Sequence, residues 1–307
     1  MKTPPKIVLS ASRRTDIPAF YMDWFMAGIT AGVFEVKNPY NGRTRQVPAT
    51  TDTVHTIVFW SKNFGPFIQG GYERTLKQMG FHLFFNFTIN SESTALEPHV
   101  PLLSTRLQQL SALTQTNPAE AISWRFDPIC RYQTGSGAPT DNLKDFDRIA
   151  EHANSCGLTR CITSFMDLYP KIKRRTARNS DIRFTTFSIA EQTERILAMH
   201  QKLNAMSIQL QTCCENDLIQ SLPSTSGITN GACIPNDLLM QLFGGRLSIK
   251  KDTGQRTTFG CNCKVSVDIG SYDLHPCFHN CLFCYANPAP PPEKTALRSS
   301  PAEGCAK

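Results

Sequence analysis

The sequence has no apolar run of the ~18 residues or more that a membrane-spanning helix requires. Its first residues, 1–14, also lack the apolar central stretch of a secretory signal. We therefore expect a cytoplasmic protein with no membrane partner. No internal repeat is visible, and 40% hydrophobic against 19% charged residues is typical of a globular chain whose 307 residues can bury a core.

Cysteine, in contrast, is abundant, with twelve residues in the chain. In a reducing compartment such cysteines more often bind metals or act as catalytic thiols than form disulfides. The formal net charge of +7 is compatible with a polyanionic partner such as nucleic acid, but many enzymes carry as much.

Short apolar or β-branched segments alternate with longer segments of helical spacing, which predicts parallel β/α units. The predicted strands are 6–12, 53–63, 81–90, 121–129, 158–167, 206–213 and, after an irregular region, 264–273. The predicted helices are 23–32, 67–80, 101–115, 142–157, 188–205 and a short one at 236–244. Six or more such units predict an α/β fold with a partial or full TIM-like β/α barrel. We expect one domain, 1–287, with a cysteine-rich irregular insert at 213–263 and a disordered proline-rich tail, 288–307.

Polar clusters end several of the predicted strands, where a β/α barrel opens its active-site mouth. They are Ser10 to Asp16, Trp60 to Asn63, Asn86 to Asn90, and Arg125 with Asp127. Ordinary helix caps are the alternative interpretation. We favour a lined pocket with Lys62 and Asp127 as candidate catalytic groups. Cys130, just past Asp127, is a further candidate as a hydrogen-donating thiol, while Cys156 and Cys161 are expected to pack in the core.

Near the end of the chain, Cys277, Cys281 and Cys284 are spaced Cys-x3-Cys-x2-Cys. Three interpretations are open. The thiols are coincidental buried cysteines, or they bind zinc together with His275 or His279. Alternatively they hold an iron–sulfur cubane with one iron free for a further ligand.

This spacing, with Phe283 before the third cysteine, resembles the cluster motif of the radical S-adenosylmethionine (radical SAM) superfamily. The whole chain also resembles a bacterial family of unknown function with such C-terminal cysteines, and more distantly the spore photoproduct lyase-type proteins. The segments that carry the resemblance are SASRRTDIPAFY, FWSKN, RFDPI, KKDTGQR, CNCKVSVDIGSYD and CFHNCLFCYAN. The resemblance implies a [4Fe-4S] cluster that cleaves S-adenosyl-L-methionine to a 5′-deoxyadenosyl radical, which abstracts hydrogen from a substrate that the sequence does not identify.

In that superfamily the cluster loop follows the first barrel strand, whereas here it follows the last predicted strand, 264–273. The resemblance therefore implies a circular permutation, with the cluster strand moved to the chain end and 6–12 as the second strand. One departure is that the proline-rich tail offers no good candidate for the helix that normally follows the loop.

The resemblance also implies roles for individual residues. Cys277, Cys281 and Cys284 would bind the cubane. The S-adenosylmethionine contacts would be Ser10, Ser12 and Arg14 to the amino group, Asn86 and Thr88 to the ribose, Arg125 to the carboxylate, and Tyr285 and Asn287 to the adenine or amino acid. An oxidoreductase or lyase of this type would take electrons from a donor such as flavodoxin or ferredoxin. The alternatives are a photolyase-like DNA lesion repair enzyme and a non-catalytic zinc or iron–sulfur binding module.

A second cysteine set precedes the cluster strand. Cys233, Cys261, Cys263 and one of Cys213 or Cys214 are candidate ligands of an auxiliary iron–sulfur cluster or a structural zinc. The alternative is that these are reduced cysteines without a metal. A basic run, 171–178, is expected to be a solvated loop or a phosphate-binding segment.

Overall fold

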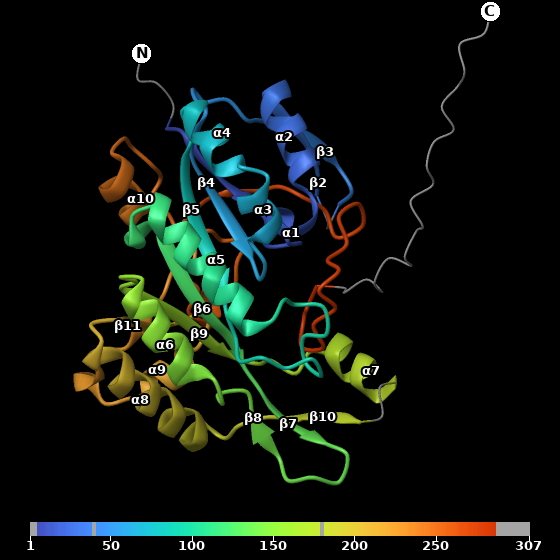
Figure 1. Ribbon diagram of the computed structural model, residues 1–307, viewed down its shortest axis with the longest axis vertical. Coiled ribbons are helices and arrows are strands. Elements are labelled where there is room, and N and C mark those ends of the chain that lie inside the picture. The colour runs from blue at the N-terminus through green and yellow to red at the C-terminus, as the bar shows by residue number, and fades with distance from the viewer. Residues whose placement is uncertain (1–4, 39–40, 179–180, 287–307) are drawn as a thin grey trace, which may run out of the picture.

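A parallel sheet of eight strands forms the centre of the protein (Figure 1). The computed structural model describes residues 5–38, 41–178 and 181–286, so Asn287 and the tail 288–307 lie outside the described residues. The strands follow the order β12-β11-β9-β6-β5-β4-β1-β13, and every neighbouring pair is parallel. They are β1 (Ile7–Ala11), β4 (Val54–Ser61), β5 (His82–Thr88), β6 (Ile122–Ile129), β9 (Arg160–Phe165), β11 (Gln209–Thr212), β12 (Thr229–Asn230) and β13 (Val267–Asp268). The predicted α/β class is confirmed.

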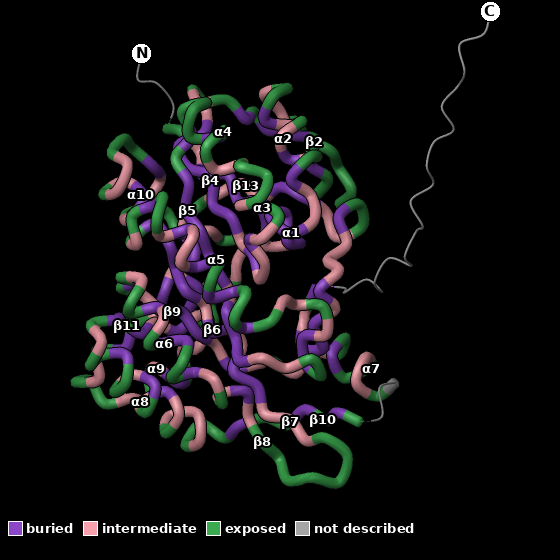
Figure 2. Tube along the Cα trace, viewed as in Figure 1, coloured by how far each residue is buried: buried purple, intermediate pink, exposed green. Residues whose placement is uncertain are grey.

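The two faces of this sheet bury different partners, as the alternation of side chains along a strand requires. Leu9, Phe59 and Phe85 belong to the large core on the helical face. Val58 and Phe84 point the other way and pack with residues of the segment 233–263. The strands are therefore apolar on both sides, which is the pattern of a parallel sheet covered on both faces, and Figure 2 shows them buried.

The helices of the β/α units lie against the first of these faces (Figure 1). They are α1 (Ile17–Phe20), α2 (Met22–Ala31), α3 (Gly65–Gln69), α4 (Tyr72–Gln78), α5 (Leu103–Thr116), α6 (Phe146–Ser155), α8 (Ile189–Ala205) and α9 (Asn216–Ser221). Helix α8 begins with a capping box in which Ser188 and Glu191 bond each other's backbone N–H groups. The single helix predicted over 67–80 is wrong: Gly70 and Gly71 separate α3 from α4, and Gly71 has a left-handed φ of 64°.

Two smaller sheets and several short helices lie outside the central sheet. Strands β2 (Val33–Lys37) and β3 (Thr44–Pro48) form an antiparallel hairpin. A three-stranded sheet contains β10 (Ile182–Thr185), β7 (Arg131–Thr134) and β8 (Thr140–Asp141). Short 3-10 helices occur at Ala119–Ala121, Ser224–Ser226 and Thr257–Phe259. Sequence reasoning predicted neither of the two small sheets.

The structure departs from the prediction in three further places. The strand expected over 264–273 is reduced to the two residues of β13, which pairs in parallel with β1. The insert 213–263 contains helix α10 (Asn236–Phe243), as predicted, and also α9 and β12. The basic run is a helix, α7 (Pro170–Arg178), and not a loop. Among the described helices, none combines the length and apolarity that a membrane crossing requires.

Candidate functional site

Polar groups at the end of β1 and just after it meet around one carboxylate, Asp268 of β13. Asp268 Oδ1 accepts hydrogen bonds from Ser10 Oγ at 2.7 Å and from the Arg13 N–H at 3.0 Å. Its Oδ2 lies 3.3 Å from Arg14 Nε and 3.5 Å from Ser12 Oγ. The predicted residues Ser10, Ser12 and Arg14 are thus brought together, and β13 supplies their common partner. Sequence reasoning missed Asp268, although a carboxylate between the apolar residues Val267 and Ile269 was the available signal.

A second carboxylate, that of the buried Asp16, joins the cysteine loop to the ends of β1 and β4. Asp16 Oδ2 accepts hydrogen bonds from Ser61 Oγ at 3.0 Å and from the Lys62 N–H at 2.9 Å, and lies 2.7 Å from His279 Nε2. Its Oδ1 accepts the Ala19 N–H and thereby caps helix α1. Because a carboxylate only accepts, His279 donates through Nε2, and the loop is held at the edge of the sheet.

The cysteine loop is further fixed through its backbone carbonyls. Arg175 Nη1, from α7, lies 2.6 Å from the Leu282 carbonyl oxygen, 3.0 Å from that of Cys284 and 3.4 Å from that of Cys281. On the other side, Tyr21 donates its hydroxyl to the Pro276 carbonyl at 2.5 Å. Figure 1 shows this C-terminal segment, in red, running from the neighbourhood of α1 toward α7.

Burial raises the pKa of the thiols of this loop. The pKa of Cys277 is raised to about 12 by burial and then by the negative charge of Asp16. Burial also raises the pKa of Cys281 and of Cys284, and the negative charge of Glu97 raises both further. All three are free cysteines, and the charge of Cys284 raises the pKa of both Cys277 and Cys281. Lys62 and Arg175 oppose part of this shift at Cys284, and Lys62 does so at Cys281. A thiolate-bound metal cation would lower the pKa of all three thiols further.

Lys62, a predicted catalytic group, lies directly beside this loop. Its Nζ is 2.6 Å from Glu97 Oε1, and the same carboxylate oxygen is 3.8 Å from Cys281 Sγ. Lys62 Nζ also lies 5.3 Å from the centre of the Phe283 ring. Burial opposes the charge of Lys62, but Glu97 and Cys281 raise its pKa above the ordinary value, so its ammonium stays charged. Sequence reasoning missed Glu97, which no motif marks.

Arg125 and Asp127 pair with each other on β6. Arg125 Nη2 bonds Asp127 Oδ2, and Ser164 Oγ bonds the other carboxylate oxygen. The Arg125 guanidinium also lies 5.1 Å from the centre of the Trp60 ring. Burial opposes its charge, yet Asp127 and then the thiols of Cys233 and Cys213 raise its pKa. Arg125 therefore faces the second cysteine set as well as Asp127.

The remaining predicted site residues differ in their surroundings. Asn86 is fully buried and donates from Nδ2 to the Cys233 carbonyl at 2.9 Å, while Thr88, on the same strand, is half-buried. Tyr285 is exposed and donates its hydroxyl to the Arg13 carbonyl at 3.0 Å. Cys130 is buried in the apolar cluster that also holds Cys281. Cys130 thus packs beneath the cysteine loop.

The second cysteine set is also gathered by the fold. Three of its members are buried on the face of the sheet opposite the helices, namely Cys233, Cys261 and Cys263. Cys213 and Cys214 pack against them. Cys161 lies in the core on the helical face, and half-buried Cys156 packs against that core, as predicted. Within residues 5–38, 41–178 and 181–286, no group of three or more His, Cys, Asp or Glu side chains is arranged to hold a metal ion as it stands.

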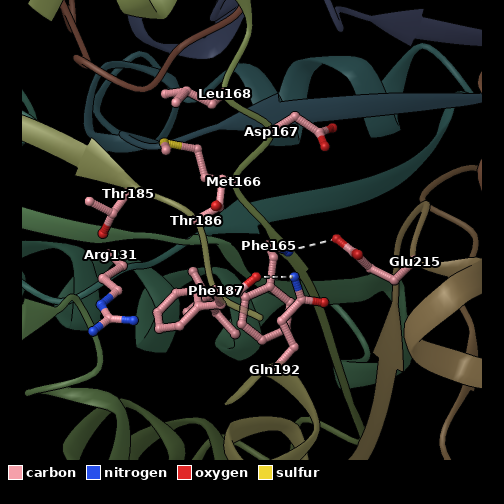
Figure 3. A pocket seen from close by; sticks show the side chains of 11 residues that line it. Arg131, Phe165, Met166, Asp167, Leu168, Thr185, Thr186, Phe187, Gln192 and Glu215 are labelled. Carbon is pink, nitrogen blue, oxygen red and sulfur yellow. Dashed lines mark hydrogen bonds between the residues drawn. The ribbon is translucent and has the colours of Figure 1, made fainter. Parts of the chain in front are cut away.

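A pocket of about 150 Å³ lies beyond the end of β9 (Figure 3). Figure 3 shows Phe165, Phe187 and Gln192 on one side of it and Glu215 on the other, with Glu215 accepting the Phe165 N–H at 2.7 Å. Burial raises the pKa of Glu215 to about 8. The pocket is distinct from the predicted mouth between Arg125, Lys62 and the cysteine loop, and sequence reasoning did not predict it.

Comparison with known proteins gives one match. A family described as a domain of unknown function (DUF1848) matches residues 8–286, which include both cysteine sets and every strand of the central sheet except the first residue of β1. No curated protein matches the chain.

Proposed function

The chain belongs to the DUF1848 family, and we propose that it is a radical SAM-type enzyme. In this proposal Cys277, Cys281 and Cys284 hold a [4Fe-4S] cluster, and S-adenosyl-L-methionine binds the iron that the three thiolates leave free. The sheet is then a partial, circularly permuted β/α barrel in which β13 is the displaced cluster strand.

The observation that carries this proposal is the position of β13. Val267 and Asp268 pair in parallel with Leu9 and Ser10 of β1, and the Cys-x3-Cys-x2-Cys loop leaves the sheet directly after β13. The loop therefore starts at the carboxyl edge of a parallel sheet, where α/β proteins build their binding sites. Its contact with Asp16, which stands just after β1, supports the same arrangement.

The chemistry of the donors supports an iron–sulfur cluster more than a zinc ion completed by histidine. Both ring nitrogens of His279 have partners, because Nε2 bonds Asp16 and Nδ1 lies 3.3 Å from the His99 carbonyl oxygen, and His275 Nδ1 accepts the Ser271 N–H at 3.1 Å. Zinc takes four protein ligands in structural sites, whereas a cubane held by three thiolates keeps one iron open. With both histidines in structural contacts, three thiolates are the ligands that the loop offers.

The surrounding residues would prepare this site for its ligands. Lys62, charged and next to Cys281, would compensate the negative charge of the thiolates. Arg14 and Ser12 contact Asp268 and would orient its carboxylate toward the amino group of S-adenosylmethionine. The planar guanidinium group of Arg125 can bind a carboxylate through two N–H groups. It would give up part of its contact with Asp127 to bind the carboxylate of S-adenosylmethionine. When bound, the cluster and S-adenosylmethionine supply the 5′-deoxyadenosyl radical that abstracts hydrogen.

The experiment is anaerobic reconstitution with iron and sulfide, followed by incubation with S-adenosylmethionine and dithionite. We expect release of 5′-deoxyadenosine and its loss in Cys281→Ala. Cys156→Ala is the matched control, because this half-buried thiol packs against the core on the helical face, away from the loop. A chain that binds only zinc, or that forms the cubane but never releases 5′-deoxyadenosine, contradicts the proposal.

A further inference from the structure

Four thiols of the second cysteine set form a contacting ring on the face of the sheet opposite the helices. The side chain of Cys213 contacts those of Cys233 and Cys261, and the side chain of Cys263 contacts the same two. The ring therefore runs through Cys213, Cys233, Cys263 and Cys261. Three separate chain segments supply it, so no local sequence motif produces this grouping.

Cys214 stands outside this ring. Its Sγ lies 3.7 Å from Cys213 Sγ, and it also contacts Cys261. It does not share the contacts with Cys233 and Cys263 that close the ring. It has a left-handed φ of 64°, which lets the chain turn after β11 while Cys213 points inward. Of the two adjacent cysteines, Cys213 is the one placed as a ligand.

We propose that Cys213, Cys233, Cys261 and Cys263 form a second metal site, for one tetrahedral thiolate-bound ion such as zinc. A tetrahedral ion with metal–sulfur bonds of about 2.3 Å separates its sulfur ligands by about 3.8 Å. Cys233, Cys261 and Cys263 lie in one buried cluster against which Cys213 packs, and neighbouring thiols of the ring are in side-chain contact, as such a site requires. A cubane would hold its cysteine sulfurs much farther apart, because its inorganic core lies between them.

The ring is not a finished ligand shell as it stands. Side-chain rotation that shortens its two diagonals turns a ring of four sulfurs into a tetrahedron. Metal binding supplies the free energy for this step, because structural zinc sites form together with the fold around them. The segment 233–263 has few regular elements, among them α10 and a 3-10 helix. A metal bound by these cysteines would hold the segment against the sheet.

The position of the ring relates it to the first site. Arg125 lies near Cys213 and Cys233, and Arg13 lies near Cys233 and Cys263, so that thiolates at these positions raise the pKa of both guanidinium groups. Arg13 is also bonded, through its N–H, to Asp268. Arg125 also pairs with Asp127 of β6, so both arginines link the ring to the polar groups of the candidate site. The ion would lie on the face of the sheet opposite the helices, next to Arg13 and Arg125.

The test uses cobalt(II) and zinc with the full-length Cys281→Ala protein, in which the first site is removed. This choice makes the result independent of the proposed radical chemistry. We expect about one cobalt per chain, with the strong visible bands and sulfur-to-metal charge transfer of a tetrahedral thiolate site, displaced by zinc. Adding Cys213→Ala is expected to abolish the tetrahedral spectrum, while adding Cys214→Ala leaves it in place.

Loss of folding is separated from loss of a ligand by a second variant. Cys213→His, added to Cys281→Ala, keeps four donors, and we expect it to retain about one ion with a shifted Cys3His spectrum. No stoichiometric cobalt binding by Cys281→Ala overturns the proposal. So does a tetrahedral spectrum that survives Cys213→Ala, or an iron–sulfur cubane at this position.

Discussion

His279 Nε2 lies 2.7 Å from Asp16 Oδ2, although the two residues are 263 positions apart in the chain. Both side chains are almost fully buried. Their contact joins the cysteine loop after the last strand to the residues that follow the first strand, at the edge of the sheet where β13 pairs with β1. The first prediction concerns this pair.

We expect His279→Ala and Asp16→Asn to be coupled. Each removes a buried hydrogen bond to a charged group, and such bonds contribute about 1.5–3 kcal/mol to the free energy of unfolding. In a double-mutant cycle measured by urea denaturation, the double variant should lose about 1–3 kcal/mol less than the sum of the single variants. Asp52→Asn, on the exposed turn before β4, is the control and should change little. Additive losses contradict a direct Asp16–His279 interaction.

Arg175 gives a prediction about the loop's dynamics. Its guanidinium lies within 3.4 Å of the carbonyl oxygens of Cys281, Leu282 and Cys284, while Lys173 on the same helix is exposed. Arg175→Gln removes these contacts, so hydrogen–deuterium exchange of the loop amides at Leu282 and Cys284 should accelerate.

Lys173→Gln provides the matched control, because it removes the same charge from the same helix without touching the loop. Its loop amides should exchange at the wild-type rate. Equal acceleration in both variants would show that helix charge, and not the carbonyl contacts, determines loop stability.

Asn280 has a left-handed φ of 54° between the first two cysteines of the loop. Asparagine and glycine tolerate this conformation, whereas a β-branched residue is strained by about 1–3 kcal/mol. Asn280→Gly should therefore unfold at a urea concentration close to that of the wild type, and Asn280→Val at a clearly lower one. A neutral valine variant would mean that the loop adopts a different turn.

The repair alternative predicts DNA binding through the exposed basic face of α7, formed by Lys171, Lys173 and Arg174. Replacing all three by glutamine should lower the slope of log affinity against log salt concentration by about 2–3 on duplex DNA. Arg175 is left in place because it holds the cysteine loop. No binding of DNA at low salt, or a slope that the triple variant does not change, removes this alternative.

Much of the fold was predictable because local pattern and tertiary structure agree. The six main strands and the helix at 188–205 have strong apolar periodicity, and the structure has strands β1, β4, β5, β6, β9 and β11 and helix α8 at these positions. The two-residue strand β13 was overestimated because its apolar pattern extends beyond the residues that find a partner on β1. Pairing, and not composition, determines where such an edge strand ends.

The candidate site was predictable only as far as its motif extends. The cysteine spacing identified Cys277, Cys281 and Cys284, and strand ends identified Ser10, Lys62 and their neighbours. Their partners, Asp268, Glu97 and Arg175, come from elements whose relative placement no local pattern encodes. The choice between Cys213 and Cys214 likewise depends on which thiol the turn after β11 directs inward.

The central claim is that the loop of Cys277, Cys281 and Cys284 supports radical chemistry on S-adenosylmethionine. The most direct measurement is the amount of 5′-deoxyadenosine that the anaerobically reconstituted protein releases under dithionite. The proposal predicts release that requires S-adenosylmethionine and reductant and disappears in Cys281→Ala. Absence of 5′-deoxyadenosine from a preparation with about four irons per chain in the loop would contradict it.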